Sequence, residues 1–509
     1  MDFFCIISMN KALKYIILCV IILSGFWFRF QGIRDNHSFW SDEAFVATLA
    51  RDVLQEKRTM SDALYQYGYQ RMHLLTTMGS MKVFGFNEFS ARIPSVLFGT
   101  ASIFVAFLLA SALSNIYGGI LASFLLAFSQ LQLANDTQAK AYSALTLLFL
   151  SVLYLLVRLE KKGKYSIKTH VVIIVLSSFA TLFHYLGILI WIPYATHIIA
   201  THHVAIFAQC KKPLHIIVTI AIAGFLFYIL DIGTILGYFF QGGTFGMFLF
   251  PVNNMTYFRE LLWRHYSFIT MAAIVGMFIG VYEKKFSWSI ALFVFLLFYC
   301  YLWIFKQSTH NIRYIVPLFG IIFVYFCVFW ANVATKLFPK HQLLFVLSLI
   351  LLLYIGGYKI VRKPSTYYSP NADLYGDVQN ADYKTFFELL KQRYPDLSNV
   401  VVFTDWGDTQ HWYLPEKPVQ AYFMKRFESE KSEANNIDNV MMYGTVDQFI
   451  AEQKKYPKGL VVVEDWVSFF PDEIKEHVKS NLTRELRVES LSQASGDVWP
   501  LELYSWGME

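Results

Sequence analysis

Charged residues are scarce in this chain of 509 amino acids, at 16% of the sequence, whereas apolar residues make up 56%. A soluble domain usually carries about 25% charged residues. This shortage of charge excludes a soluble globular protein, because one soluble core could not bury so many apolar side chains. Apolar runs of about 20 residues recur instead, which is the length of a helix that crosses a bilayer. The composition therefore predicts an integral membrane protein with many spans.

Cysteine is also rare, and its five positions lie in predicted spans or on the predicted cytoplasmic side. They are Cys5, Cys19, Cys210, Cys300 and Cys327. The segments predicted on the outer face contain no cysteine, which excludes a disulfide framework there. A small-residue cleavage site is lacking after the first apolar run, so we expect that run to be an uncleaved span.

Hydropathy predicts about eleven spans. They lie near residues 12–33, 93–113, 116–135, 141–158, 169–184, 186–207, 214–232, 266–282, 287–305, 313–335 and 341–361. The stretch 169–207 is too long for one helix and suits two short ones.

Lysine and arginine fix the predicted orientation, because they gather in cytoplasmic loops. With the N-terminus inside, the inner side carries Lys11, Lys14, Arg158, Lys161, Lys162, Lys164, Lys168, Lys211, Lys212, Lys284, Lys285, Lys336 and Lys340. An odd number of spans then places the C-terminus outside. Three outer segments result, near 34–92, 233–265 and everything after 362.

The sequence predicts two domains, a transmembrane domain at 1–362 and an extracytoplasmic domain at 363–509 that begins with a linker at 363–380. The outer domain alternates helix and buried strand, which indicates a small α/β fold with a largely parallel sheet. The predicted helices are 385–394 and 446–456, and the predicted strands are 399–405, 459–465, 484–491 and 499–505.

The first outer loop, 34–92, opens with HSFWSDEAFVATLARDV at 37–53. Apolar residues recur there at helical spacing, which predicts an amphipathic helix lying on the membrane. Asp42 and Glu43 fall in its first turn. One interpretation is helix capping and compensation of the helix dipole. The other is chemistry, because a helix N-terminus favours the ionised carboxylate that a general base needs.

Five pieces of sequence share one predicted face of the membrane. They are WSDEA (40–44), FGFNEFSARIPSVLFG (84–99), NDTQAKAYSAL (135–145), His184-Tyr185 and Arg313-Tyr314-x-x-Pro317. In this order they resemble the GT-C type membrane glycosyltransferases, and most closely glycosyltransferase family 39. That group includes the protein O-mannosyltransferases and the lipid A aminoarabinose transferase. Each piece is weak alone, and their common order and position carry the resemblance.

The resemblance implies a polytopic α-helical fold and an inverting enzyme. Its donor would be a sugar linked to polyprenyl phosphate, and its acceptor a glycan, lipid or protein on the outer face. Asp42 matches the family's proposed general base, and Glu43 matches the acidic neighbour. A base is needed because a hydroxyl is a poor nucleophile until its proton is removed.

The sequence departs from the family pattern in two places. Relatives often carry Glu-Ala-Arg-Pro-Tyr where this chain has Gln138-Ala139-Lys140-Ala141-Tyr142. Many also carry a Pro-Pro pair, sometimes after Glu-Lys, where this chain has Tyr69-Gln70-Arg71-Met72. The acid that helps relatives to hold a metal is thus absent. We expect no resident cofactor and a weak or absent dependence on a divalent metal.

Cations are expected around the donor phosphate, which carries the negative charge of the leaving group. The candidates are Arg313, Lys140, Arg92 and Arg71. For the first three, which lie at span ends, the alternative is snorkelling of a long side chain to the membrane interface. The remaining candidates for the site are Asp136, Gln138, Tyr142, His184, Tyr185 and Tyr314. For His184 the alternative is a satisfied interfacial residue.

Two other classes of function remain open. A lipid or oligosaccharide transporter is one, although transporters often contain internal repeats and this chain shows none. An O-antigen polymerase or ligase is the other, and the early Asp-Glu pair favours family 39 over it. The run QGGTFG at 241–246 is interpreted as a flexible loop or a lid over the donor. Expected partners are the donor, an acceptor of unknown identity and membrane lipids, without nucleic acid, in a bacterial inner membrane.

Overall fold

The computed structural model describes a large part of the chain. The described residues are 11–34, 38–162, 166–199, 213–234, 260–282, 312–356, 358–369, 381–404, 407–423, 433–434, 440–464, 470–490 and 500–508. Packing divides the chain into two compact units. The helical unit is Met1–Arg34, Tyr67–Thr76 and Arg92–Leu374, and the α/β unit is Asp35–Gln66, Thr77–Ala91 and Tyr375–Glu509. The predicted domain boundary between 362 and 363 stays a prediction.

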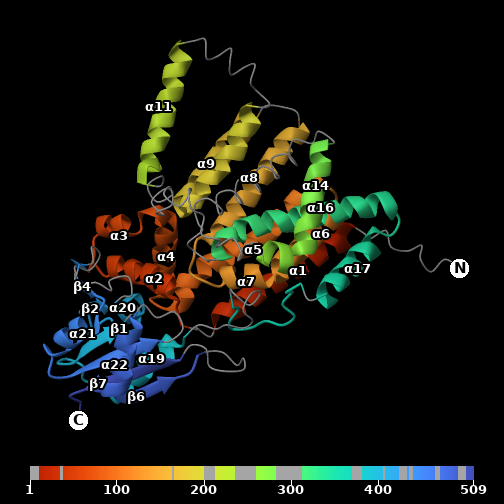
Figure 1. Cartoon of the computed structure of the whole chain (residues 1–509). Coiled ribbons are helices and arrows are strands. Elements are labelled where there is room, and N and C mark those ends of the chain that lie inside the picture. The colour runs from red at the N-terminus through yellow and green to blue at the C-terminus, as the bar shows by residue number, and fades with distance from the viewer. Residues whose placement is uncertain are drawn as a thin grey trace. The chain divides into compact units, whose positions relative to one another are not determined.

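Apolar helices make up the helical unit (Figure 1). The helices are α1 (Lys11–Arg34), α4 (Arg71–Phe84), α5 (Glu88–Leu113), α6 (Ile116–Phe128), α7 (Gln130–Asp136), α8 (Tyr142–Lys162), α9 (Ile167–Phe183), α11 (Pro213–Ile229), α14 (Ser267–Tyr282), α16 (Val316–Leu337) and α17 (Gln342–Ile355). Short 3-10 helices are η1 (Gly68–Gln70), η2 (Tyr185–Ile190) and η5 (Ile312–Ile315), and η4 (Glu260–His265) is a short π-helix. The bounds of α4 and α5 extend into the α/β unit.

Four described helices are long and apolar enough to cross a membrane. They are Ala12–Ile33, Glu88–Leu113, Tyr142–Lys161 and Arg313–Leu337. Six more of the predicted spans coincide with shorter apolar helices, and the predicted span 287–305 lies outside the described residues. The predicted class, a polytopic α-helical membrane protein, is confirmed, and the count of eleven stays a prediction.

Helix α16 forms the centre of the helical unit, where it packs against α6, α8, α14 and α17. Its side chains are buried almost all the way round, from Val316 to Val328. Helix α1 instead leaves Ile16, Val20 and Leu23 exposed. A helix that is apolar on every side belongs in the interior, whereas exposed apolar faces suit contact with lipid.

Two breaks interrupt the apolar runs of this unit. The predicted span 116–135 is not one helix, because Ser129 is extended and separates α6 from α7. The segment after α17 forms backbone hydrogen bonds with this break. Gln130 N–H donates to Lys359 O at 2.9 Å, and Val361 N–H donates to Phe128 O at 2.8 Å. The second break is the extended His184, between α9 and η2, where two predicted short spans meet.

The α/β unit contains the predicted helix of the first loop, α2 (Ser41–Leu54), followed by α3 (Met60–Gln66). Its apolar residues Val46, Leu49 and Ala50 are buried, and α2 packs against α20 (Gly407–Tyr413). The prediction that this face lies on the membrane is therefore wrong, because protein already covers it.

The α/β unit also contains two small sheets (Figure 1). The strands are β1 (Val401–Thr404), β2 (Ala421–Phe423), β3 (Glu433–Ala434), β4 (Met441–Tyr443), β5 (Gly459–Glu464), β6 (Thr483–Val488) and β7 (Leu501–Trp506). The larger sheet has the order β1-β5-β7-β6, and the smaller has the order β2-β4-β3. Only β1–β5 and β2–β4 are parallel pairs among the described strands, so the predicted largely parallel sheet is wrong. Parallel neighbours need a long crossover connection, and β6 is followed directly by β7 without a described helix between them.

Both faces of the larger sheet are covered, because successive side chains of a strand point to opposite faces. Val402, Leu460 and Val462 join the core under α19 (Tyr383–Arg393). Phe403 and Val461 join the core on the other face, under α21 (Val446–Gln453) and α22 (Asp472–Asn481). This two-sided burial explains why the strands read as continuous apolar runs.

Candidate active site

The junction between α7 and α8 carries the acid Asp136, which lies in a buried ion pair. Arg29 of α1 holds it, with Nη2 at 2.7 Å and Nε at 2.9 Å from Asp136 Oδ2. Both side chains are 1% exposed. Gly99 of α5 leaves the space for this acid, since a Cβ there would come 2.3 Å from Asp136 Cγ.

Arg29 is a residue that the sequence analysis did not single out. Besides Asp136 it donates to Gly25 O at 3.0 Å, Ala127 O at 3.1 Å and Leu126 O at 2.9 Å. The guanidinium therefore joins α1, the carboxyl end of α6 and the end of α7. The available signal was an arginine inside a predicted span, where a charge is expensive and points to a functional or structural partner.

The turn after Asp136 presents Gln138 and Lys140. Lys140 N–H donates to Gln138 O at 2.8 Å, and Ser95 Oγ of α5 donates to Lys140 O at 3.1 Å. His73 Nε2 lies 3.0 Å from Ala139 O and donates to it, because a carbonyl accepts only. Gln138 is 2% exposed, and its Nε2 has no hydrogen-bond partner in the described part of the chain. The Lys140 side chain is half-buried.

Four of the aromatic and histidine candidates come together next to this turn. Tyr142 Oη lies 3.4 Å from His184 Nε2, and the His184 ring lies 4.2 Å from the Tyr185 ring. Tyr314 completes the cluster, with its ring 6.1 Å from that of Tyr142. His184 Nδ1 accepts the Leu186 N–H at 3.1 Å, so the proton of a neutral ring lies on Nε2.

The four candidate cations have different surroundings. The Arg313 guanidinium lies 5.5 Å from the Tyr314 ring, which places it beside the aromatic cluster. Arg92 is fully buried in α5, one turn before the Ser95 that contacts Lys140 O. Arg71 forms an ion pair with Asp231, which follows α11. A phosphate that binds Arg71 would therefore compete with a carboxylate.

Asp42 and Glu43 belong to the α/β unit, where they occupy the first turn of α2. Glu43 is fully buried, and its Oε2 accepts the Trp40 N–H at 3.1 Å. That bond is helix capping, the first of the two interpretations of the pair. Asp42 is exposed. Next to it, Ser41 Oγ donates to Asp408 Oδ2 at 2.9 Å, which ties the start of α2 to α20.

The described residues contain no group of three or more His, Cys, Asp or Glu side chains arranged to hold a metal ion. The candidate lid at 241–246 lies outside the described residues.

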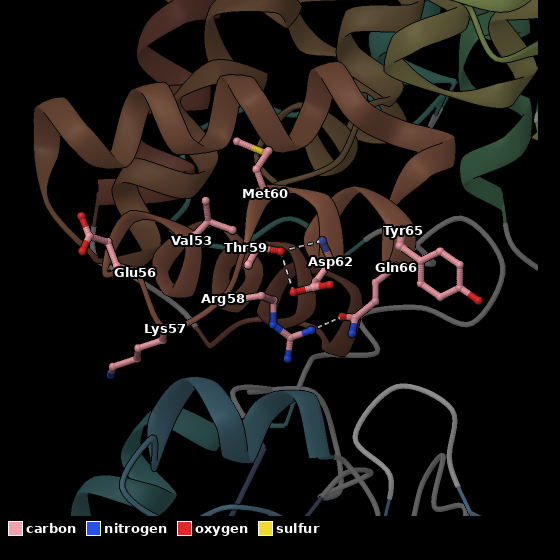
Figure 2. A pocket seen from close by; sticks show the side chains of 9 residues that line it. All are labelled: Val53, Glu56, Lys57, Arg58, Thr59, Met60, Asp62, Tyr65 and Gln66. Carbon is pink, nitrogen blue, oxygen red and sulfur yellow. Dashed lines mark hydrogen bonds between the residues drawn. The ribbon is translucent and has the colours of Figure 1, made fainter.

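A hollow of about 740 Å³ opens beside the turn between α2 and α3. Figure 2 shows its lining, in which Arg58 bonds Gln66 and Thr59 bonds Asp62. None of the candidate site residues lines this hollow. Two pairs of its polar groups bond each other, as in an ordinary surface turn.

Residues 72–229 match the family model described as dolichyl-phosphate-mannose-protein mannosyltransferase. This segment includes the α7–α8 junction and His184. No curated protein matches the sequence.

Solved structures extend the likeness to the whole chain. ArnT from Cupriavidus metallidurans matches in the apo state and bound to undecaprenyl phosphate. Each match has a TM-score of 0.57 and 13% identity, and covers 97% of this chain and 98% of ArnT. An oligosaccharyltransferase from Archaeoglobus fulgidus matches with a TM-score of 0.55 and 13% identity, over 87% of this chain and 67% of that protein.

The fold of ArnT and the matching family model together confirm the resemblance that the motifs predicted. The chain has the fold of a GT-C type membrane glycosyltransferase.

Proposed function

We propose that the protein transfers one sugar from a polyprenyl-phosphate carrier to an acceptor on the outer face of the membrane. The observation that carries this proposal is the ArnT fold over nearly the full length of both chains, one of those structures holding undecaprenyl phosphate. The bacterial inner membrane is the proposed location.

The chemistry is a single displacement with inversion. Asp42 takes the proton from the acceptor hydroxyl, and the resulting oxygen attacks the anomeric carbon of the sugar. The bond from that carbon to the phosphate oxygen breaks, and polyprenyl phosphate leaves with both bonding electrons. The acceptor oxygen gains the sugar, and the proton stays on Asp42 until solvent removes it.

Cations of the helical unit stabilise the leaving phosphate. Arg313 lies beside the cluster of Tyr142, His184 and Tyr314, and Lys140 precedes Tyr142 by two residues in the chain. Charge-assisted hydrogen bonds to phosphate are about twice as strong as neutral ones. Arg92, one turn before the Ser95 that bonds Lys140 O, is a third candidate for the phosphate, and Arg71 joins only if the donor displaces Asp231. Gln138 is proposed to bond a sugar hydroxyl with its buried amide.

A donor assay tests the proposal against the two open alternatives. Purified protein and an acceptor extract are supplied with polyprenyl-phosphate monosaccharides and, separately, with a lipid-linked oligosaccharide. Release of polyprenyl phosphate from the monosaccharide donor alone supports the proposal. Use of the oligosaccharide alone indicates a polymerase or ligase, and movement of lipid across vesicles without donor cleavage indicates a transporter.

A further inference from the structure

A second cleft lies inside the α/β unit, apart from all of the candidate residues above. Its volume is about 320 Å³, at the small end of the range of about 300–1,000 Å³ for ligand pockets. Its lining includes Phe86, Glu88, Lys384, Glu388, Trp412 and Tyr413. They come from the start of α5 and the turn before it, from α19, and from α20.

The polar groups of the cleft are open to a ligand. Glu88 is only 7% exposed, and its carboxylate has no hydrogen bond or ion pair with the described part of the chain. The Lys384 ammonium and the Glu388 carboxylate have no partner among the described residues either. These three groups can therefore bond a ligand that offers both hydrogen-bond donors and acceptors.

Aromatic surface lies beside these groups. Phe86 is 45% exposed. The Tyr413 ring stacks on Phe387 at 6.1 Å and an angle of 14°, and the Arg51 guanidinium lies 5.2 Å from the Trp412 ring. These packed rings form rigid apolar walls, and such walls with a few convergent polar groups are typical of small-molecule sites.

The charges in the cleft select the class of ligand. Arg51 already bonds Trp412 O and His411 O, and Lys391 pairs with Glu416 at 3.4 Å. The carboxylates of Glu88 and Glu388 and the ammonium of Lys384 therefore remain to bond a ligand. An anionic ligand would face both acids, and a cationic one would face the ammonium. A sugar hydroxyl both donates and accepts, so it satisfies both kinds of group.

We infer that this cleft binds a neutral sugar residue, with ring hydroxyls on Glu88, Glu388 and Lys384 and a ring face on Phe86. That this sugar belongs to the acceptor rests on the proposed function. The cleft would then hold the acceptor glycan by the α/β unit, separately from the cations assigned to the donor.

Saturation-transfer NMR on the full-length protein tests the inference. The protein is kept in a detergent without a sugar headgroup, and the probes are neutral methyl pyranosides of glucose, galactose and mannose. Methyl glucuronide, methyl glucosaminide and a serine-containing tetrapeptide serve as comparators. At least one neutral pyranoside should show saturation of its ring protons, with the charged sugars and the peptide weaker by about tenfold in affinity.

Variants locate the binding. Phe86→Ala and Glu88→Gln should each weaken pyranoside binding by about tenfold. Tyr65→Ala and Glu56→Gln are the matched controls, because they change an exposed aromatic ring and an exposed acid in the other hollow. They should bind as the wild type does.

Three results would overturn the inference. They are no binding of any neutral pyranoside, binding of only the charged sugars or the peptide, and binding that Phe86→Ala and Glu88→Gln leave unchanged. Donor cleavage, measured with donor and acceptor extract but without an added pyranoside, reports on the proposed function alone. A protein that binds pyranosides but never cleaves donor would refute that function and keep the cleft as a sugar site.

Discussion

At the scale of single residues, Asp42 and Glu43 are neighbours with different surroundings. Glu43 is fully buried and caps α2 through the Trp40 N–H, whereas Asp42 is exposed at the same helix end. A carboxylate already committed to a backbone donor is a poor proton acceptor. The two acids therefore divide the roles, with Glu43 holding the helix end that presents Asp42.

Glu43→Ala should destabilise the protein by about 0.5–2 kcal/mol, the usual cost of losing a helix cap. Glu43→Gln should cost less, since its amide oxygen still accepts the Trp40 N–H. Thermal unfolding of the detergent-solubilised variants measures both. Equal stability of Glu43→Ala and the wild type would show that the cap contributes nothing.

Lys140 offers a sharper test of the donor phosphate site. Lys140→Ala should weaken donor binding, because it removes a half-buried cation. Lys140→Arg should bind donor at least as well as the wild type, because the guanidinium presents a planar fork to phosphate. The measurement is a titration of polyprenyl-phosphate sugar against the three purified proteins. Unchanged affinity in both variants would leave Lys140 as a snorkelling side chain.

Motifs predicted which residues meet around His184, but not the partner that holds Asp136. Tyr142, Tyr185 and Tyr314 could be chosen because the family pattern marks them. Arg29 lies 107 positions from Asp136, and a single sequence gives no sign of that pairing. The pairing of Arg71 with Asp231 was hidden for the same reason.

At the scale of elements, Arg29 of α1 links three helices, because it bonds Asp136 of α7 and two backbone carbonyls of α6. Arg29→Met or Asp136→Leu alone should cost about 3–5 kcal/mol, because each leaves a buried charge without its partner. The double variant should be more stable than either single variant, since it removes both charges. Thermal unfolding of the three variants gives the comparison.

The opposite order of stabilities would contradict this account. If the stability lost by the double variant equals the sum of the losses of the two single variants, Arg29 and Asp136 act independently. Asn115→Ala, which removes the side-chain cap of α6, is a useful control for a loss confined to one helix end.

Helices and strands could be predicted from the sequence where their apolar residues follow one periodicity. The packing partners of these elements could not be predicted, because they depend on tertiary contacts. Helix α2 was predicted from its apolar spacing, yet the partner of its apolar face was wrong because α20 lies more than 350 residues later. The strands of β1 and β5 were evident from their apolar runs. The antiparallel pairing of β5 with β7 was not evident, since strand direction depends on connections rather than on composition.

At the scale of the whole molecule, the charges of the loops predict eleven spans with the C-terminus outside. A reporter active only after export, fused after Glu509, should be active, and a second fusion after Lys285 should be inactive. A cytoplasmic signal from the fusion after Glu509 would change the span count by one. It would also move the α/β unit to the wrong side of the membrane for the proposed acceptor.

The central claim is transfer from a polyprenyl-phosphate sugar with Asp42 as the base. The most direct measurement is the release of polyprenyl phosphate by purified wild type and Asp42→Asn, each with donor and acceptor extract. The account predicts turnover by the wild type and a loss of at least about 10²-fold in Asp42→Asn, with unchanged donor affinity and normal folding. Near-normal turnover in Asp42→Asn would contradict it.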